Sequence, residues 1–256
     1  MPSRATRQKC PICGESRFRQ KFPIDRSGER FHIVACEACG FIFVIDPPAD
    51  TASHAEEGQQ LVWRFRSRHE QIRRLLLAHL KPGASVLEIG CGRGELGYIM
   101  RNDPLSYIGY EPAHGLAEFG IAAGVNIVRE PYFGGMSADA VVIDNVIEHV
   151  TEPALMIRTA AESLKPNGLL IVITPNVDDI RRLSASWRQK YLWVPPDHIN
   201  YFSARDISRM FRDAGIIDRR FRFSPLTLSD WKYFPRAIAE CLGLSILGHN
   251  VFGVKN

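Results

Sequence analysis

The sequence predicts an α/β fold, in which helices cover both faces of a mostly parallel sheet, with a small cysteine-rich module in front of it. Short runs of Val, Ile and Leu alternate with helix-like stretches, which is typical of buried parallel strands. A glycine-rich turn follows the first of these runs, and two Cys-x-x-Cys pairs near the N-terminus predict the separate module. A chain of 256 residues has room for both parts.

Composition narrows the class of protein. With 45% hydrophobic and 23% charged residues, the chain is typical of globular proteins. A net charge of +4 is far from the dense positive surface of a dedicated nucleic-acid binder. No stretch approaches the roughly 20 apolar residues of a membrane-spanning helix, and residues 1–9 lack the apolar core of a secretion signal. Because cysteines in metal-ligand pairs are typical of reducing compartments, we expect a cytoplasmic protein.

The two Cys-x-x-Cys pairs predict a zinc-ribbon module over residues 1–46. Each pair places two thiolates on one tight turn, which Gly14 and Gly40 allow to close. Two such turns, 22 residues apart, supply the four soft ligands that tetrahedral zinc prefers: Cys10, Cys13, Cys36 and Cys39. Four cysteines leave no open coordination position, so the expected role of the metal is structural. We expect strands at 31–35 and 41–45, and we interpret Cys91 and Cys241 as packing residues.

Residues 47–80 are expected to form a linker followed by a helix. The prolines and small polar residues of 46–53 disfavour regular structure. From Leu61 to Leu80 apolar residues recur at helical spacing, and the sequence 81–83, Lys-Pro-Gly, ends the helix. Arginines 64, 66, 68, 73 and 74 fall between the apolar positions, and we expect this arginine face to be solvated.

The α/β domain is expected to cover residues 81–256. Buried strands are predicted at 85–89, 107–110, 126–128, 140–143 and 169–173, with late strands at 217–223 and 250–254. Helices are predicted after the first strand and at 115–123, 153–164 and 203–213. A stretch at about 177–202 departs from this pattern and predicts a lid-like insertion. Its interleaved cationic and aromatic side chains either bind the substrate or form the core of the lid.

The turn after the first strand predicts a cofactor site. It reads VLEIGCGRG, with glycines spaced as G-x-G-x-G at Gly90, Gly92 and Gly94. Dinucleotide enzymes use a similar loop, but here Glu95 stands where their third glycine is expected. Glu111 ends the second strand, 17 residues after Gly94. A carboxylate at this position can accept hydrogen bonds from both hydroxyls of a ribose.

The segments VLEIGCGRGELG, YIGYEP, ADAVVIDNVIEHV and LKPNGLLIVITPN resemble successive motifs of class I S-adenosylmethionine-dependent methyltransferases, closely over 85–176. The resemblance implies a Rossmann-like, seven-stranded, mostly parallel sheet and S-adenosylmethionine as the cofactor. It also implies that Asn145 lies beside the reactive sulfonium and that Glu88 accepts from the ammonium group of the cofactor. The implied cofactor residues are Glu88, Gly90, Gly92, Gly94, Glu111 and Asn145.

Three residues are candidates for the chemistry: Glu148 and His149, just beyond the fourth strand, and His198, in a loop after the fifth. One hypothesis is that they hold a second, divalent cation against the acceptor oxygen. The segment VIEHV resembles the metal-binding segment of ubiquinone-pathway and small-RNA methyltransferases, which carry a further glutamate where this chain has Asn145. The second hypothesis makes His149 or His198 a general base without a metal. The third gives all three residues structural roles.

The leading functional hypothesis is methyl transfer to a small-molecule acceptor, at a hydroxyl or a sugar carbon of a metabolite or saccharide. A methyltransferase domain preceded by two cysteine knuckles also resembles enzymes of saccharide and natural-product pathways. The first alternative is an RNA methyltransferase whose zinc ribbon binds RNA, for which we expect a connected basic surface and steep salt dependence. The second alternative is a non-catalytic binding protein that retains the fold.

Overall fold

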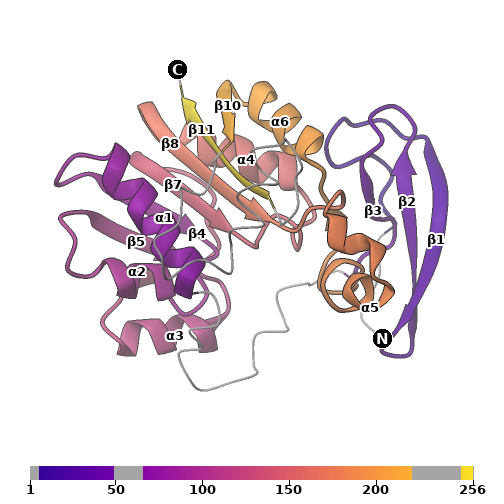
Figure 1. Ribbon diagram of the computed structural model, residues 1–256, viewed down its shortest axis with the longest axis horizontal. Coiled ribbons are helices and arrows are strands. Elements are labelled where there is room, and N and C mark those ends of the chain that lie inside the picture. Colours follow the sequence, from indigo (N-terminus) through magenta and orange to yellow (C-terminus); the bar gives the residue numbers. More distant parts are fainter. Residues whose placement is uncertain (1–5, 49–65, 221–248, 256) are drawn as a thin grey trace.

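The computed structural model describes residues 6–48, 66–220 and 249–255, which form two sheets with their helices. Figure 1 shows the smaller sheet at one side of the molecule and the larger sheet, with its helices, at the other. Among the described residues, no helix is long and apolar enough to cross a bilayer. Cys241 and residues 61–65 of the predicted helix lie outside the described residues.

The larger sheet has seven strands in the order β10-β11-β8-β7-β4-β5-β6. Only β11 runs antiparallel to its neighbours, so the predicted Rossmann-like, mostly parallel sheet is confirmed. The strands are β4 (Ser85–Ile89), β5 (Ser106–Tyr110), β6 (Ile127–Val128), β7 (Ala138–Asp144), β8 (Leu164–Thr174), β10 (Ile216–Arg220) and β11 (His249–Lys255). Both predicted late strands therefore join this sheet, although residues 221–223 of the first lie outside the described residues.

Helices cover both faces of this sheet because successive strand residues point to opposite sides. On one face α1 (Arg66–His79) and α2 (Glu95–Met100) pack against alternate residues of the central strands. On the other face α4 (Pro153–Glu162) and α6 (Ala204–Asp213) pack against the residues between them. The helix α3 (His114–Ala122) contacts β6 at the edge. Since α1 supplies core residues such as Leu76, the domain begins before the predicted residue 81.

The smaller sheet has four antiparallel strands in the order β1-β2-β3-β9. Its strands are β1 (Phe18–Arg26), β2 (Glu29–Cys36), β3 (Ile42–Val44) and β9 (Asn200–Tyr201). The strands β2 and β3 were predicted from the sequence, but β1 was not, because Pro23 and several charged residues interrupt its apolar pattern. Such residues are tolerated because β1 is an edge strand.

The strand β9 comes from the predicted lid-like insertion, so the insertion is not a free lid over the larger sheet. The insertion forms η3 (Ile180–Leu183), α5 (Ala185–Trp187) and η4 (Arg188–Leu192) before it reaches β9. Its buried Leu192 and Ile199 pack against Ile33 of β2 and Val44 of β3. The N-terminal module and the insertion therefore share one sheet and one core. Figure 1 shows α5 of the insertion on the side of the molecule where the smaller sheet lies.

Candidate active site

The glycine loop connects β4 to α2 and leaves an open surface over its middle. Gly90 has φ +70°, and a Cβ there would lie 2.5 Å from a methyl group of Val146, so a larger residue is excluded. Gly92 also has a positive φ, of +56°, but a Cβ there would meet nothing within 4 Å. The backbone at Gly92 is therefore accessible to a ligand, while Gly90 packs against the segment that follows β7.

Glu111 follows β5 and turns its carboxylate toward the glycine loop. One carboxylate oxygen accepts from the Gly92 amide at 2.8 Å, and the other accepts from the Ala113 amide at 2.8 Å. The side chain is 8% exposed, so it does not point into bulk water. Each oxygen keeps a lone pair for a further donor, such as a ribose hydroxyl. The loop and the carboxylate thus have the arrangement expected of a nucleoside-binding site.

Glu88 lies on β4 just before the loop and is buried, with 3% exposure. It accepts a hydrogen bond from the Tyr107 hydroxyl. Burial raises the pKa of Glu88 to about 8, and the negative charges of Asp144 and Glu95 act in the same direction. The carboxyl group is therefore mostly protonated at neutral pH, and an ammonium group beside it would favour ionisation.

The helix α1 contributes two residues to this region that were not predicted from the sequence. The Arg68 guanidinium donates from Nε to Asp144 at 2.8 Å, and the His69 ring lies 3.4 Å from the same carboxylate. With its amide turned so that both of its atoms find partners, the Asn145 oxygen accepts from both terminal nitrogens of Arg68 at 3.0 Å. Arg68 stands one helical turn before the buried Ile72, and this spacing is the signal that would have placed it on the inner face.

The predicted solvated arginine face of this helix is therefore wrong at two positions. Arg68 pairs with Asp144 at the site, and Arg73 forms a bidentate ion pair with Asp103 at 2.5 Å. Arg74 is exposed, as expected. A buried carboxylate favours a charged partner on the nearest helix, which explains why these two side chains turn inward.

Glu148, His149 and His198 come together beyond the end of β7. Their potential ligand atoms all lie within 4.8 Å of one another. The His149 and His198 rings are 5.0 Å apart at 74°, and His149 Nε2 lies 3.8 Å from the Glu148 carboxylate. The amide nitrogen of Asn145 donates to Glu148 at 3.2 Å. All three residues were candidates from the sequence, and the structure shows that the loops bring them together.

Hydrogen bonds hold the first two members in place. Glu148 is 1% exposed and accepts from the Thr174 hydroxyl at 2.9 Å. His149 Nδ1 lies 2.6 Å from the Asp197 carbonyl oxygen, so this nitrogen carries the proton. In the neutral ring, Nε2 is then a proton acceptor or a metal ligand.

The third member stays uncharged at neutral pH. Burial lowers the pKa of His198 to about 3, and positive charge on His149 and Arg26 acts in the same direction. Such a ring is a weak base but a competent hydrogen-bond acceptor or metal ligand. Burial also raises the pKa of Glu148. Of the two histidines, His149 is therefore the better candidate for a general base.

The N-terminal module is connected to this cluster through β9. In the sheet, Phe43 of β3 pairs with Asn200 of β9. The amides of Ile199 and Asn200 both donate to the Glu148 carbonyl oxygen, at 2.9 and 3.1 Å. The Asn200 side chain donates to the Val150 carbonyl oxygen at 2.6 Å and accepts from Arg7 at 2.9 Å. The loop that carries Glu148 and His149 is thus hydrogen-bonded to β9, which the module's strand β3 pairs with in the smaller sheet.

The four predicted zinc ligands lie together at one end of the module. The Sγ atoms of Cys10 and Cys39 are 3.6 Å apart, and those of Cys13 and Cys36 are 3.5 Å apart. A tetrahedral zinc with Zn–S bonds of about 2.3 Å needs sulfurs about 3.8 Å apart, so the four thiols fit this ion. Burial raises the pKa of Cys10 to about 12, so a cation is needed to keep its thiolate ionised.

The other described cysteine is a packing residue. Cys91 is buried and packs with Ala117, Val125 and Ile127 beside the glycine loop. All five described cysteines are free of disulfides.

Comparison with known proteins places the chain in a family. The family model of a methyltransferase domain matches residues 62–216. A ubiquinone biosynthesis O-methyltransferase of Azorhizobium caulinodans is 33% identical over 109 residues, which are 38% of this chain and 43% of that protein. Its counterpart in Caulobacter vibrioides is 30% identical over 132 residues, 44% of this chain and 50% of that protein. The chain thus matches half or less of the length of these relatives.

Solved structures share the fold. A methyltransferase dependent on S-adenosylmethionine from Archaeoglobus fulgidus superposes with a TM-score of 0.53 at 16% identity, covering 75% of this chain and 97% of the other. Magnesium protoporphyrin IX methyltransferase from Synechocystis gives a TM-score of 0.54 at 16% identity, covering 75% and 83%. Identities this low support the fold alone, whereas the family model covers more than half of the sequence. The chain belongs to the methyltransferase domain family.

Proposed function

We propose that this protein transfers the methyl group of S-adenosylmethionine to a hydroxyl oxygen of a small-molecule acceptor. The observation that carries the choice of a hydroxyl is the cluster of Glu148, His149 and His198, whose ligand atoms lie within 4.8 Å of one another. A hydroxyl nucleophile has to lose its proton, and this cluster offers the groups that assist that loss. Membership of the methyltransferase domain family supports the donor.

The donor is proposed to bind over the glycine loop. The open backbone at Gly92 would face the donor, and Glu111 would accept from the ribose hydroxyls. Val146 packs against Gly90, which brings the segment after β7 beside the loop. On this basis Asn145 would lie near the sulfonium, and Glu88 near the ammonium group. The sulfonium supplies an activated methyl group, and the protein aligns the acceptor for an in-line displacement.

His149 is proposed to take the acceptor proton at Nε2. The Asp197 carbonyl oxygen holds Nδ1–H, and the nearby Glu148 stabilises the imidazolium that forms. His198 would orient the acceptor as a neutral hydrogen-bond partner. The rival mechanism assigns the same three side chains to a divalent cation, a donor set that such ions accept. Asn145 gives that rival site a neutral amide in place of a carboxylate, which weakens it.

The proposed function is tested by methyl transfer from labelled donor to three acceptor classes: phenols, sugars and a structured RNA. We expect transfer to a phenolic or sugar hydroxyl. If His149 acts as a general base without a metal, addition of Mg²⁺ or Mn²⁺ leaves the rate of transfer unchanged. Transfer to RNA alone would contradict it. Absence of S-adenosylhomocysteine binding in a calorimetric titration would revive the non-catalytic alternative.

Glu111→Gln is expected to weaken S-adenosylhomocysteine binding by roughly 10- to 100-fold. The substitution removes charge-assisted hydrogen bonds worth about 1.5–3 kcal/mol. Isothermal titration measures the change, and Glu118→Gln is the control because Glu118 lies on the exposed side of α3, where it pairs with Arg129. Equal affinities for the wild type and Glu111→Gln would remove Glu111 from the site.

Binding of the cofactor product is expected to release a proton from Glu88. With a pKa of about 8, Glu88 is mostly protonated at pH 7 in the free protein, and an adjacent ammonium group favours the carboxylate. Affinity therefore rises with pH up to about 8, by at most tenfold per pH unit. Titrations in two buffers of different ionisation enthalpy count the protons released. Glu88→Gln should abolish the release, and Glu118→Gln, at an exposed position of α3, should keep it. Identical enthalpies in both buffers for the wild type would contradict this role.

A further inference from the structure

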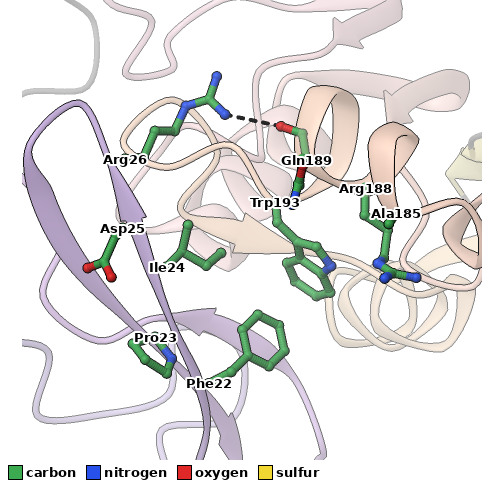
Figure 2. A pocket seen from close by; sticks show the side chains of 9 residues that line it. All are labelled: Phe22, Pro23, Ile24, Asp25, Arg26, Ala185, Arg188, Gln189 and Trp193. Carbon is green, nitrogen blue, oxygen red and sulfur yellow. Dashed lines mark hydrogen bonds between the residues drawn. The ribbon is translucent and has the colours of Figure 1, made fainter.

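A hollow lies between the edge of the N-terminal module and the insertion. Residues 22–26 of β1 form one wall, and residues 185–193 of α5 and η4 form the other, as Figure 2 shows. Its volume is about 860 Å³, which is within the range of small-molecule sites. None of the candidate cofactor residues lines it.

The hollow has an apolar, aromatic part beside its polar groups. Phe22 and Ile24 belong to alternate positions of β1, so they point to the same side of the strand. The Trp193 ring meets Phe22 edge to face at 5.1 Å and packs on Tyr201 at 4.6 Å. These contacts fix the indole in place, so it offers a rigid apolar surface to a ring or a sugar face.

Each wall also supplies a guanidinium. Arg26 donates to the Gln189 carbonyl oxygen at 3.1 Å across the hollow, and Arg188 donates to the Arg182 carbonyl oxygen. A guanidinium has five N–H donors, and these bonds use only one of each set, so donors remain for an anion. The carboxylate of Asp25 is engaged by Arg30 in a bidentate pair at 2.7 and 2.8 Å, which offsets its charge. The hollow is therefore cationic.

One wall of the hollow leads along the chain to the loop that carries His198. Trp193 is followed by Val194, whose carbonyl oxygen accepts from the His198 amide at 3.1 Å. Arg26 is also close enough for its charge to act on His198. A ligand against Trp193 and Arg26 would therefore contact the segment that leads to His198.

We propose that this hollow binds the distal part of the methyl acceptor, and that this part carries a phosphate or carboxylate beside an apolar ring or sugar face. The inference rests on the proposed function, since it assigns the occupant as the acceptor. Charge complementarity supports this proposal: two arginines line the hollow beside its apolar part, the one carboxylate in the lining is paired with Arg30, and guanidinium donors suit both anions.

The test uses the full chain with phenyl phosphate, benzoate and neutral phenol as probes in isothermal titrations. The two anionic probes are expected to bind, and phenol is expected not to bind. The anion that binds more tightly identifies the anionic group of the acceptor as a phosphate or a carboxylate. Arg26→Gln/Arg188→Gln should weaken binding at least roughly tenfold, the loss of about two charge-assisted bonds. Arg19→Gln, on the same strand but outside the hollow, should leave it unchanged. If the double variant does not fold, the partly exposed Arg188→Gln alone is used.

Two readouts separate this inference from the proposed function. S-adenosylhomocysteine affinity should be the same in the wild type and the arginine variants, because the hollow is lined by other residues than the glycine loop. Anion binding that is lost in the variants would support the hollow even if no hydroxyl is methylated. No binding of either anion, or equal binding by the double variant, would overturn it. The inference would also be overturned if both small anions fail to bind while an RNA binds the wild type and not the double variant.

Discussion

Replacement of His149 by Ala is expected to lower kcat by about 100- to 10,000-fold while the affinity for S-adenosylhomocysteine stays within about twofold. The first number is the usual contribution of a positioned general base. The second follows because His149 lies beyond β7, whereas the proposed cofactor residues other than Asn145 lie on β4, on the loop after it and at the end of β5. Steady-state kinetics with the acceptor that the transfer assay identifies, together with a calorimetric titration of the cofactor product, measure both quantities.

His114→Ala is the matched control, because His114 is exposed at the start of α3 and should have no effect. His198→Ala separates the base mechanism from the cation mechanism. His198 has a pKa of about 3 and is proposed only to orient the acceptor, so its removal should lower kcat less than the removal of His149 does. Equal losses for both histidines, with activity that depends on added Mg²⁺ or Mn²⁺, would favour the cation. A His149→Ala variant with the kcat of the wild type would refute a catalytic role for this residue.

The central sheet was predictable because local sequence determines it. The strand 140–143 is a continuous apolar run, and 85–89 is apolar except for Ser85 and Glu88; such runs occur where both faces of a strand are buried. The carboxyl ends of parallel strands meet at one edge, so the glycine loop, Glu111 and Asn145 could be assigned to that edge from their positions in the sequence. The late strands at 217 and 250 were found from their β-branched residues, although the order of strands in the sheet was not.

The contacts that shape the proposed acceptor site were not predictable in this way. The strand β9 has two residues, and nothing in its local sequence indicates that it pairs with Phe43, more than 150 positions earlier. Arg68 was misplaced because an arginine between apolar positions is usually solvated, and its partner Asp144 lies on a distant strand. Such pairings depend on tertiary packing, which overrides local propensity. The prediction that Glu148, His149 and His198 are near one another relied on the family motif and on where the loops begin.

Replacement of Cys36 by Ser is expected to abolish zinc binding and activity while the cofactor product still binds. Structural zinc sites contribute about 10–16 kcal/mol to folding of small modules, so loss of a ligand should unfold the turns at 10–14 and 36–40. The strand β3 begins just after the second turn and holds β9, which in turn holds the Glu148 carbonyl oxygen. Metal content by elemental analysis, kcat and a calorimetric titration of S-adenosylhomocysteine measure the three effects.

Comparing the loss of kcat with the loss of cofactor-product binding tests whether the zinc module positions the histidine cluster. The glycine loop and Glu111 belong to the seven-stranded sheet, whose core contains α1 and α2 and needs no metal, so the donor site should survive. The histidine cluster is held by the smaller sheet, so its geometry should be lost together with the zinc. Cys91→Ala controls for the loss of a buried thiol and should keep one zinc per chain. If Cys36→Ser loses its zinc but keeps full kcat, the hydrogen bonds from β3 through Asn200 to Glu148 do not position the catalytic loop. If both sites fail together, the module stabilises the whole protein, since the damage would then extend across the core that Phe43 shares with β7 and β8.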